Sequence, residues 1–254
     1  MIEIAKTLTQ FNETTLQDLD VIKLLKRYDT KFIFCREKLM PLLDFLSTRY
    51  EVLEIDGRRC FRYESLYYDT DDFFFYRQHH NKKYDRYKVR CRKYIDSNQC
   101  YFEIKHKSNK NKTNKSRILL GGSDILSELS EESKSFARSN ILLNGNIIDR
   151  IKPKLGVNFE RITFANRDNK ERFTIDLHIE FTGKNALQRK MDNLVIAELK
   201  SEKSSANTRL VRYLKGLKIY PASFSKYCVG VAITERNIKY NSFKNKILKL
   251  NRLN

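Results

Sequence analysis

The chain has 254 residues, of which 41% are hydrophobic, so it is long enough to bury one sizeable core. Its formal net charge of +19 favours anionic ligands such as nucleic acid, anionic lipid or polyphosphorylated molecules. It contains no run of about 18 apolar residues and no basic leader with an apolar core, so we expect neither a membrane span nor a secretory signal. We expect a cytoplasmic protein.

The five cysteines are odd in number and scattered, and no C-x-x-C pair is present to start a zinc site. We therefore expect reduced thiols. Three prolines and eight glycines leave no evident linker between domains. The interpretation is one domain over residues 1–254, with a core over about 21–236 and a basic C-terminal tail over 237–254.

In chain order, the first 25 residues carry a helical apolar stripe that includes Leu16 and Leu19, and the period then changes to the alternation typical of strands. Helices are expected at 37–47 and 70–80. A basic, low-complexity loop is expected at 108–117. Six strands rich in aromatic and β-branched residues are predicted at 27–34, 50–55, 59–70, 84–94, 99–107 and 115–120.

The second half of the chain begins with a predicted helix from Ser123 to Leu143, with Ser123 as its N-cap and Asp124 in its first turn. The tail contains enough apolar residues for a surface helix. Three further strands are predicted at 154–166, 171–181 and 193–201, followed by helices at 207–215 and 223–236.

Five of the predicted strands place charged residues at alternate positions. Because alternate side chains of a strand point to the same side, each set shares one face and opposes an apolar set. The sets are Arg27, Asp29 and Lys31; Lys88, Arg90 and Arg92; Glu103, Lys105 and Lys107; Arg172, Thr174 and Asp176; and Glu198 and Lys200.

Such faces have two interpretations. A half-buried antiparallel sheet leaves its polar face in water. However, a solvated face normally mixes both signs of charge, and like charges opposite one another on neighbouring strands are destabilising. If the strands instead close into a barrel with the charged faces inward, the lumen becomes a water-filled cationic tunnel for an elongated polyanion.

The few acidic residues on these faces are candidate metal ligands. A Mg²⁺ or Mn²⁺ ion that bridges phosphates takes oxygen ligands, often one or two carboxylates plus the substrate. Glu198 is the best candidate, because it stands among apolar residues on a late strand. A structural ion pair with a Lys or Arg is the other interpretation, and it is favoured for Glu103 and Asp176.

Nine short motifs occur in a characteristic order along most of the chain, from about residue 21 to 236. They are "RYDTKF" (27–32), "SLYYDT" (65–70), "YKVRCRKY" (87–94), "FEIKHK" (102–107), "KSR" (115–117), "FER" (159–161), "RFTID" (172–176), "AELKS" (197–201) and "SFSKY" (223–227). Each is weak alone. Together they resemble VTC domains, the polyphosphate polymerase branch of the triphosphate tunnel metalloenzymes.

The resemblance implies an α+β fold, in which a closed antiparallel β-barrel tunnel of about eight strands has a polar, cationic lumen and helices packed outside. It implies an ATP-dependent polyphosphate polymerase that adds the ATP γ-phosphate to a growing inorganic polyphosphate chain with Mn²⁺ or Mg²⁺. ATP and inorganic polyphosphate would be its partners, and a separate membrane protein is a possible further one. Nucleic acid is not expected, since no RNA-binding signature accompanies the charge.

Carried over position by position, the resemblance gives roles to fourteen residues. Catalytic stabilisation would come from Arg90, Arg92, Lys105 and Arg172, and metal binding from Glu198. Phosphate and ATP binding would come from Arg27, Lys31, Lys88, Lys115, Arg117, Arg161, Lys200, Ser225 and Lys226.

The strand that starts the barrel separates two branches of the resemblance. Hydrolytic tunnel enzymes usually have Glu-x-Glu-x-Lys there, whereas this chain has Arg27, Asp29 and Lys31. Replacing the first acid by a cation removes a metal ligand and adds a phosphate contact, as in the polymerase branch. A tunnel-type tripolyphosphatase or nucleoside triphosphatase is the alternative to the polymerase. A non-catalytic polyphosphate- or nucleic-acid-binding module is the third hypothesis.

Overall fold

The computed structural model is built around one large β-sheet. It describes residues 2–21, 28–110, 112–121, 125, 128–143, 146–168, 170–202 and 208–253. The sheet is 11-stranded. Its strands are β1 (Glu13–Thr14), β2 (Tyr28–Cys35), β3 (Glu51–Leu53), β4 (Phe61–Asp69), β5 (Arg86–Tyr94), β6 (Gln99–Lys107), β7 (Thr113–Leu119), β8 (Lys152–Asn166), β9 (Glu171–Gly183), β10 (Gln188–Met191) and β11 (Leu194–Ser201).

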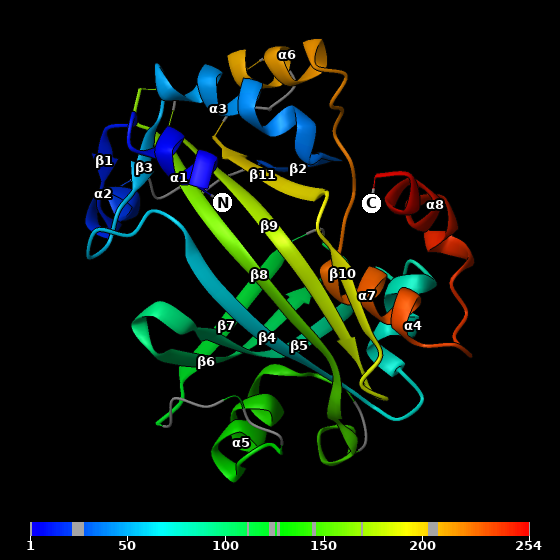
Figure 1. The fold of residues 1–254 in the computed structure, drawn as a ribbon. Helices are drawn as coiled ribbons and strands as arrows, with labels where there is room; N and C mark the ends of the chain where they lie inside the picture. The colour runs from blue at the N-terminus through cyan, green and yellow to red at the C-terminus, as the bar shows by residue number, and fades with distance from the viewer. Residues whose placement is uncertain are drawn as a thin grey trace.

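The main path of the sheet runs β2–β11–β9–β8–β4–β5–β6–β7, and each neighbouring pair is antiparallel. The long strands β8 and β9 cross the centre of the molecule in Figure 1. β10 extends β9 as an antiparallel neighbour, and β1 pairs in parallel with β3. The nine predicted strands are therefore confirmed, while the short strands β1 and β10 were not predicted.

The predicted closure of the barrel is not shown. β2 and β7 are the ends of the hydrogen-bonded path, with no ladder between them in the described ranges. The free edge of β2 instead meets the segment that leads into the late helices: Ala222 N donates to Lys31 O at 2.7 Å, and Phe32 forms an isolated bridge with Pro221. Covering an exposed edge in this way satisfies backbone groups that a neighbouring strand would otherwise pair. The fold is α+β, with a large sheet and helices around it.

Helices cover the sheet in three places (Figure 1): α3 and α6 lie together, α5 covers another part, and α4, α7 and α8 gather at a third. Short 3-10 turns occur at Arg36–Lys38, Ile95–Ser97, Ile148–Arg150 and Asn241–Phe243. The α-helices are α1 (Ile2–Leu8), α2 (Leu16–Val21), α3 (Leu39–Ser47), α4 (Phe74–His80), α5 (Glu131–Asn140), α6 (Arg209–Gly216), α7 (Lys226–Thr234) and α8 (Lys244–Leu253). None of the helices in the described part of the chain is both long and apolar enough to cross a bilayer.

The apolar faces of the strands form the core beneath these helices. Phe32 of β2, Phe173 of β9 and Leu199 of β11 pack with Leu42 of α3 and Leu210 of α6. Burying such side chains contributes about 1.5–3 kcal/mol each. Since one face of each strand is committed to this core, the opposite face is fixed as the charged one.

Helix α7 packs unusually closely on β8 and β9, and Gly230 permits it. A Cβ atom at Gly230 would lie 2.5 Å from Leu155 Cδ2 and 2.6 Å from Phe181 Cδ1, too close for any other residue without a shift. The close contact fixes the position of the N-terminus of α7, where Ser225 caps the helix by accepting from Cys228 N at 3.2 Å.

Two predicted helices are wrong in extent. The first 25 residues are not one helix, because α1 ends at Leu8 and β1 intervenes before α2, which starts after Thr15; residues 22–27 lie outside the described ranges. The predicted helix of 123–143 is reduced to α5, whose N-cap is Ser130, while Ser123 and Asp124 also lie outside the described ranges.

Three smaller differences concern the other predicted elements. The predicted loop of 108–117 is shorter, because β7 begins at Thr113 and pairs with β6. The remaining predicted helices are present with shifted ends, and the tail contains the predicted surface helix as α8. All five cysteines are free thiols, as predicted.

Candidate functional site: a cationic face

One face of the sheet collects cations from seven strands, and we call it the charged face. The register proves the shared orientation: Glu198 lies opposite Lys31, Lys200 opposite Arg172, and Arg161 opposite Asp176. The register of the other half places Lys88 opposite Lys105 and Lys105 opposite Lys115. Its charged members are Asp29, Lys31, Lys88, Arg90, Arg92, Glu103, Lys105, Lys115, Arg117, Arg161, Arg172, Asp176, Glu198 and Lys200, joined by Lys226 of α7.

The two halves of the charged face lie close to each other although β2 and β6 are far apart in the strand order. Desolvation and then the charges of Lys105 and Lys200 lower the pKa of Lys31 to about 7. Electrostatic interactions weaken with distance, so Lys105 of β6 lies near Lys31 of β2. The face is therefore curved around a common interior.

Lys105 shows how crowded this interior is with positive charge. Desolvation of its ammonium group, together with the charge of Lys88, lowers its pKa to about 8. The residue as a whole remains exposed, so an anion in solution can reach it. Such cations are under-neutralised by the protein, and an anion would stabilise them.

The N-terminus of α7 reaches into the charged face. Lys226 pairs with the buried carboxylate of Asp176, and its ammonium lies 4.1 Å from the centroid of the Phe159 ring. Next to it, Ser225 Oγ accepts from Lys88 Nζ at 2.9 Å. A helix outside the sheet thus contributes two polar side chains to the interior.

Two buried carboxylates organise the cations, as the ion-pair interpretation predicted. Asp176 accepts from Arg161 Nε at 2.6 Å and Nη2 at 2.8 Å, in bidentate geometry. Glu103 accepts from Arg90 Nε at 2.7 Å and pairs with Lys115. Despite burial, which raises it, the pKa of Glu103 is lowered to about 2 by Arg90, Arg92 and Lys115. Both acids therefore stay ionised.

Arg92 is a buried cation with no carboxylate partner among the described residues. Only 8% of its surface is exposed. Its Nε donates to Ser65 Oγ at 3.1 Å, and its guanidinium carbon lies 5.5 Å from the ring centroids of Tyr63 and Phe159. Burial and the charge of Arg90 lower the pKa of Arg92. A buried charge that forms no ion pair is costly, so this position favours an anionic ligand.

Glu198, the predicted metal ligand, lies between two cations. It pairs with Lys31, and its Oε2 is 3.0 Å from Lys200 Nζ. Within the described ranges, no group of three or more His, Cys, Asp or Glu side chains is arranged around a metal position. The donor set therefore fits a hard cation that arrives with phosphate oxygens and takes one carboxylate, and it does not fit a metal held by protein ligands alone.

The other predicted residues take different places. Arg172 is half-buried at the start of β9, whereas Arg117 is exposed on the edge strand β7, its guanidinium 4.6 Å from the Tyr101 ring. Arg27 lies outside the described residues. A pocket of about 450 Å³ opens beside Lys31, between β2 and the segment before α7; it is lined by Asp29, Thr30, Lys31, Pro221, Ala222, Ser223 and Phe224.

The sequence analysis missed the contribution of β4, whose residues on the charged face carry no charge. Tyr63, Ser65 and Tyr67 lie opposite Tyr94, Arg92 and Arg90 of β5. Ser65 and Tyr67 accept hydrogen bonds from the two arginines. Their alternation at positions 63, 65 and 67 is the sequence pattern that could have placed them together on one face of β4.

Several solved structures are similar to this chain. A Hippeastrum adenylyl cyclase candidate, described as having a dominant triphosphatase activity, has a TM-score of 0.50 and 14% identity, and the match covers 84% of this chain and 98% of that one. An adenylate cyclase candidate from Vibrio parahaemolyticus has a TM-score of 0.48, 10% identity and coverage of 82% and 99%. At 14% identity the likeness to the Hippeastrum structure concerns the fold alone.

A third solved structure, from Pyrococcus horikoshii, matches with a TM-score of 0.44 and 12% identity over 82% of this chain and 100% of that one. No curated protein matches the chain. A family model, the VTC domain, matches residues 26–235. This range includes the whole charged face that the structure describes, and the chain belongs to the VTC domain family.

Proposed function

We propose that this protein is an ATP-dependent polyphosphate polymerase that transfers the γ-phosphate of ATP to a growing inorganic polyphosphate chain along the charged face. The observation that carries the proposal is the excess of positive charge on the charged face. Arg92 is buried without a carboxylate partner in the described ranges, and lysines from β2, β6, β7 and α7 have lowered pKa values. A linear polyanion supplies the missing charge along its whole length.

The reaction needs positioning and charge neutralisation more than covalent chemistry. A terminal oxygen of the acceptor phosphate attacks the γ-phosphorus, a new P–O bond forms, and the bond between the γ-phosphorus and the bridging oxygen breaks, so ADP leaves with that bond's electron pair. The acceptor is already an anion, and no protein nucleophile is required. Charge on the transferred group would be stabilised by Arg90, Arg92, Lys105 and Arg172.

The remaining cations, together with one serine, would hold the chain on both sides of the reacting phosphate. This proposed set is Arg27, Lys31, Lys88, Lys115, Arg117, Arg161, Lys200, Ser225 and Lys226. Glu198 would hold Mn²⁺ or Mg²⁺, with phosphate oxygens completing the coordination. A bound divalent ion would supply further neutralisation of phosphate charge. The residues of the chain itself would orient ATP and acceptor in line.

The test is incubation of purified protein with ATP and Mn²⁺, or Mg²⁺, followed by gel separation of the products. A ladder of long phosphate chains with stoichiometric ADP supports the proposal. Orthophosphate alone indicates the alternative, a tunnel-type triphosphatase, which the activity described for the Hippeastrum protein makes the natural competitor. Binding of polyphosphate without either product indicates a non-catalytic module.

A further inference from the structure

We infer that Tyr67 is a phosphate-contacting residue of the charged face, where its hydroxyl group donates a hydrogen bond to the bound phosphate chain. The inference deepens the proposed function and rests on it. Tyr67 belongs to the motif "SLYYDT", in which the charge pattern marks no ligand-binding residue.

Tyr67 lies on the charged face because of its register. It is opposite Arg90 of β5, and its neighbour Tyr68 points to the apolar side, where the Tyr68 hydroxyl donates to Cys91 Sγ at 3.3 Å. The Tyr67 side chain is almost fully buried, with 5% exposure. Its hydroxyl oxygen accepts from Arg90 Nη1 at 3.1 Å. The phenol therefore sits beside a cation that we place at the reacting phosphate.

The hydroxyl proton of Tyr67 has no acceptor among the described residues. Other buried tyrosines do donate: Tyr227 to Asp69, Tyr50 to Glu171, and Tyr76 to Lys239 O at 2.9 Å. Buried donors in native proteins are nearly always paired, and leaving one unpaired costs about 1–3 kcal/mol. A phosphate oxygen on the charged face would be the acceptor that Tyr67 lacks.

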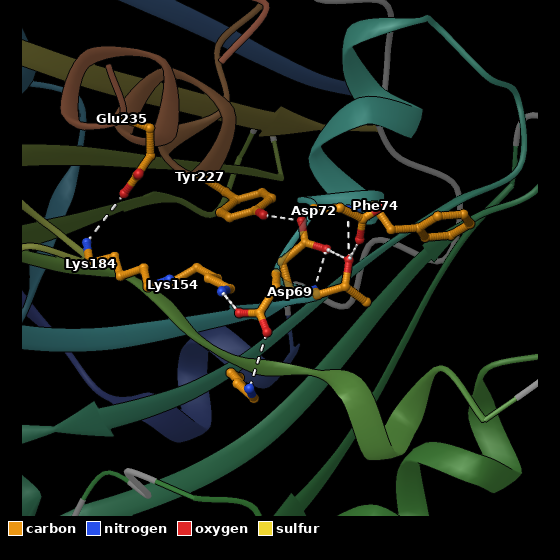
Figure 2. A network of polar contacts seen from close by, with 10 residues as sticks. Asp69, Asp72, Phe74, Lys154, Lys184, Tyr227 and Glu235 are labelled. Carbon is orange, nitrogen blue, oxygen red and sulfur yellow. Dashed lines mark hydrogen bonds and ion pairs between the residues drawn. The ribbon is translucent and has the colours of Figure 1, made fainter. Parts of the chain in front are cut away.

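An aromatic ring of α7 holds the phenol ring of Tyr67 in place. The ring of Tyr227 in α7 stacks on it with centroids 5.1 Å apart and an interplanar angle of 24°. Figure 2 shows how Tyr227 in turn bonds to Asp69, at the end of β4. Asp69 also accepts from the backbone of Phe75 and Tyr76 in α4, each at 2.8 Å. These contacts orient the Tyr67 ring, so its hydroxyl proton is not needed to hold the side chain in place.

The surrounding charges make this phenol a strong donor. Burial raises its pKa, but the charges of Arg90, Arg92 and Lys88 outweigh burial and lower the pKa of Tyr67 to about 8. These three cations face it from β5, and Lys226 faces it from α7. β8 contributes the apolar Leu155 and Val157 to the cluster around the ring. Hydrogen bonds to a charged acceptor are about twice as strong as neutral ones.

The first experiment compares Tyr67→Phe with Tyr68→Phe for binding of inorganic tripolyphosphate, by calorimetry at neutral pH without metal. Both variants remove one hydroxyl from adjacent buried residues, but only the first alters the charged face. We expect roughly tenfold weaker binding for Tyr67→Phe, and wild-type affinity for Tyr68→Phe. Wild-type affinity in Tyr67→Phe, with both variants folded, overturns the inference.

The second experiment follows tyrosinate absorbance in the near ultraviolet, which is unobstructed because the chain has no tryptophan. We expect one tyrosine to ionise near pH 8 in the wild type and to be missing in Tyr67→Phe. Bound tripolyphosphate should move this ionisation to higher pH, because the anion opposes a second negative charge beside it. If tripolyphosphate leaves the pH of this ionisation unchanged, Tyr67 does not contact the phosphate directly. That outcome would indicate water as the acceptor of the hydroxyl proton.

The outcomes separate this inference from the proposed function. If Tyr67→Phe binds tripolyphosphate like the wild type while Arg92→Met does not, the charged face remains the phosphate site and Tyr67 is only structural. If the wild type itself neither binds tripolyphosphate nor makes phosphate chains from ATP, the proposed function fails, and with it the role of Tyr67.

Discussion

Lys226 of α7 forms a buried ion pair with Asp176 of β9, and this contact joins a helix outside the sheet to the charged face inside it. Asp176 also binds Arg161 of β8 through both nitrogens. One carboxylate therefore neutralises two cations, and it fixes the N-terminus of α7 at the position where Ser225 meets Lys88.

Asp176→Asn should destabilise the protein strongly, because it leaves Arg161 and Lys226 buried beside a neutral amide. Breaking a buried pair costs about 3–5 kcal/mol in general. Urea unfolding at neutral pH measures the change, and tripolyphosphate should restore more stability to the variant than it gives the wild type. The control is Glu131→Gln, which removes the exposed pair with Lys134 on α5 and should cause no measurable loss. Equal stability of Asp176→Asn and wild type contradicts the assignment.

Glu103→Gln should reveal a contribution to stability that depends on pH. The pKa of Glu103 is lowered in the folded state, so its ion pairs stabilise fully above the ordinary carboxyl value and are lost as the pH falls from about 5 towards 2. We expect the variant to be less stable by roughly 2–3 kcal/mol at pH 7. The difference should shrink steadily in acid. Urea unfolding of both proteins at several pH values tests this, and a difference that stays constant from neutral pH to pH 3 contradicts it.

Arg92→Met should separate activity from stability. The arginine is buried without a carboxylate partner in the described ranges, so replacing it with an apolar side chain removes a buried charge that forms no ion pair and should leave stability equal or higher. Turnover of ATP should fall by about 100-fold or more, because a preorganised donor is lost. Arg189→Met, on the exposed strand β10, is the matched control and should retain activity. A stable Arg92→Met that keeps full turnover removes Arg92 from the proposed mechanism.

Periodicity was sufficient to predict which charged residues share a face within each strand. A strand presents alternate residues to one side whatever its neighbours are, so Arg90 and Arg92, or Glu198 and Lys200, could be placed together from sequence. The approach of Lys105 to Lys31 could not, because it depends on the curvature of the whole sheet. Tyr67 was missed because a search for charge passes over a neutral phenol, although its position in the alternation was visible.

The wrong first helix has a local physical cause. Thr15 Oγ1 accepts from Asp18 N at 3.2 Å, and Asp18 reaches back to Thr15 N at 3.1 Å. This reciprocal pair is a capping box, which starts a new helix at α2 and ends any continuation from α1. The apolar period is correct at Leu19, which is buried, but not at Leu16, which is 56% exposed. A stripe alone cannot detect such an interruption.

Glu198→Gln should have opposite effects on binding and turnover. In the absence of metal, the substitution removes the negative charge that lies between Lys31 and Lys200, so both cations become available to phosphate. Tripolyphosphate should then bind about tenfold more tightly, since a unit charge near such a site is worth a few kcal/mol before solvent screening. With Mn²⁺, turnover of ATP should fall by about 100-fold, because the carboxylate ligand is lost.

Calorimetry without metal and product analysis with metal measure the two quantities on the same preparation. Glu132→Gln, an exposed substitution on α5, should change neither. If Glu198 were only a structural partner of its lysines, metal-free binding would still rise, but turnover would keep its dependence on Mn²⁺ and most of its rate. Weaker metal-free binding in Glu198→Gln would instead show that the carboxylate is needed to hold Lys31 and Lys200 in place, and that the phosphate chain does not pass between them.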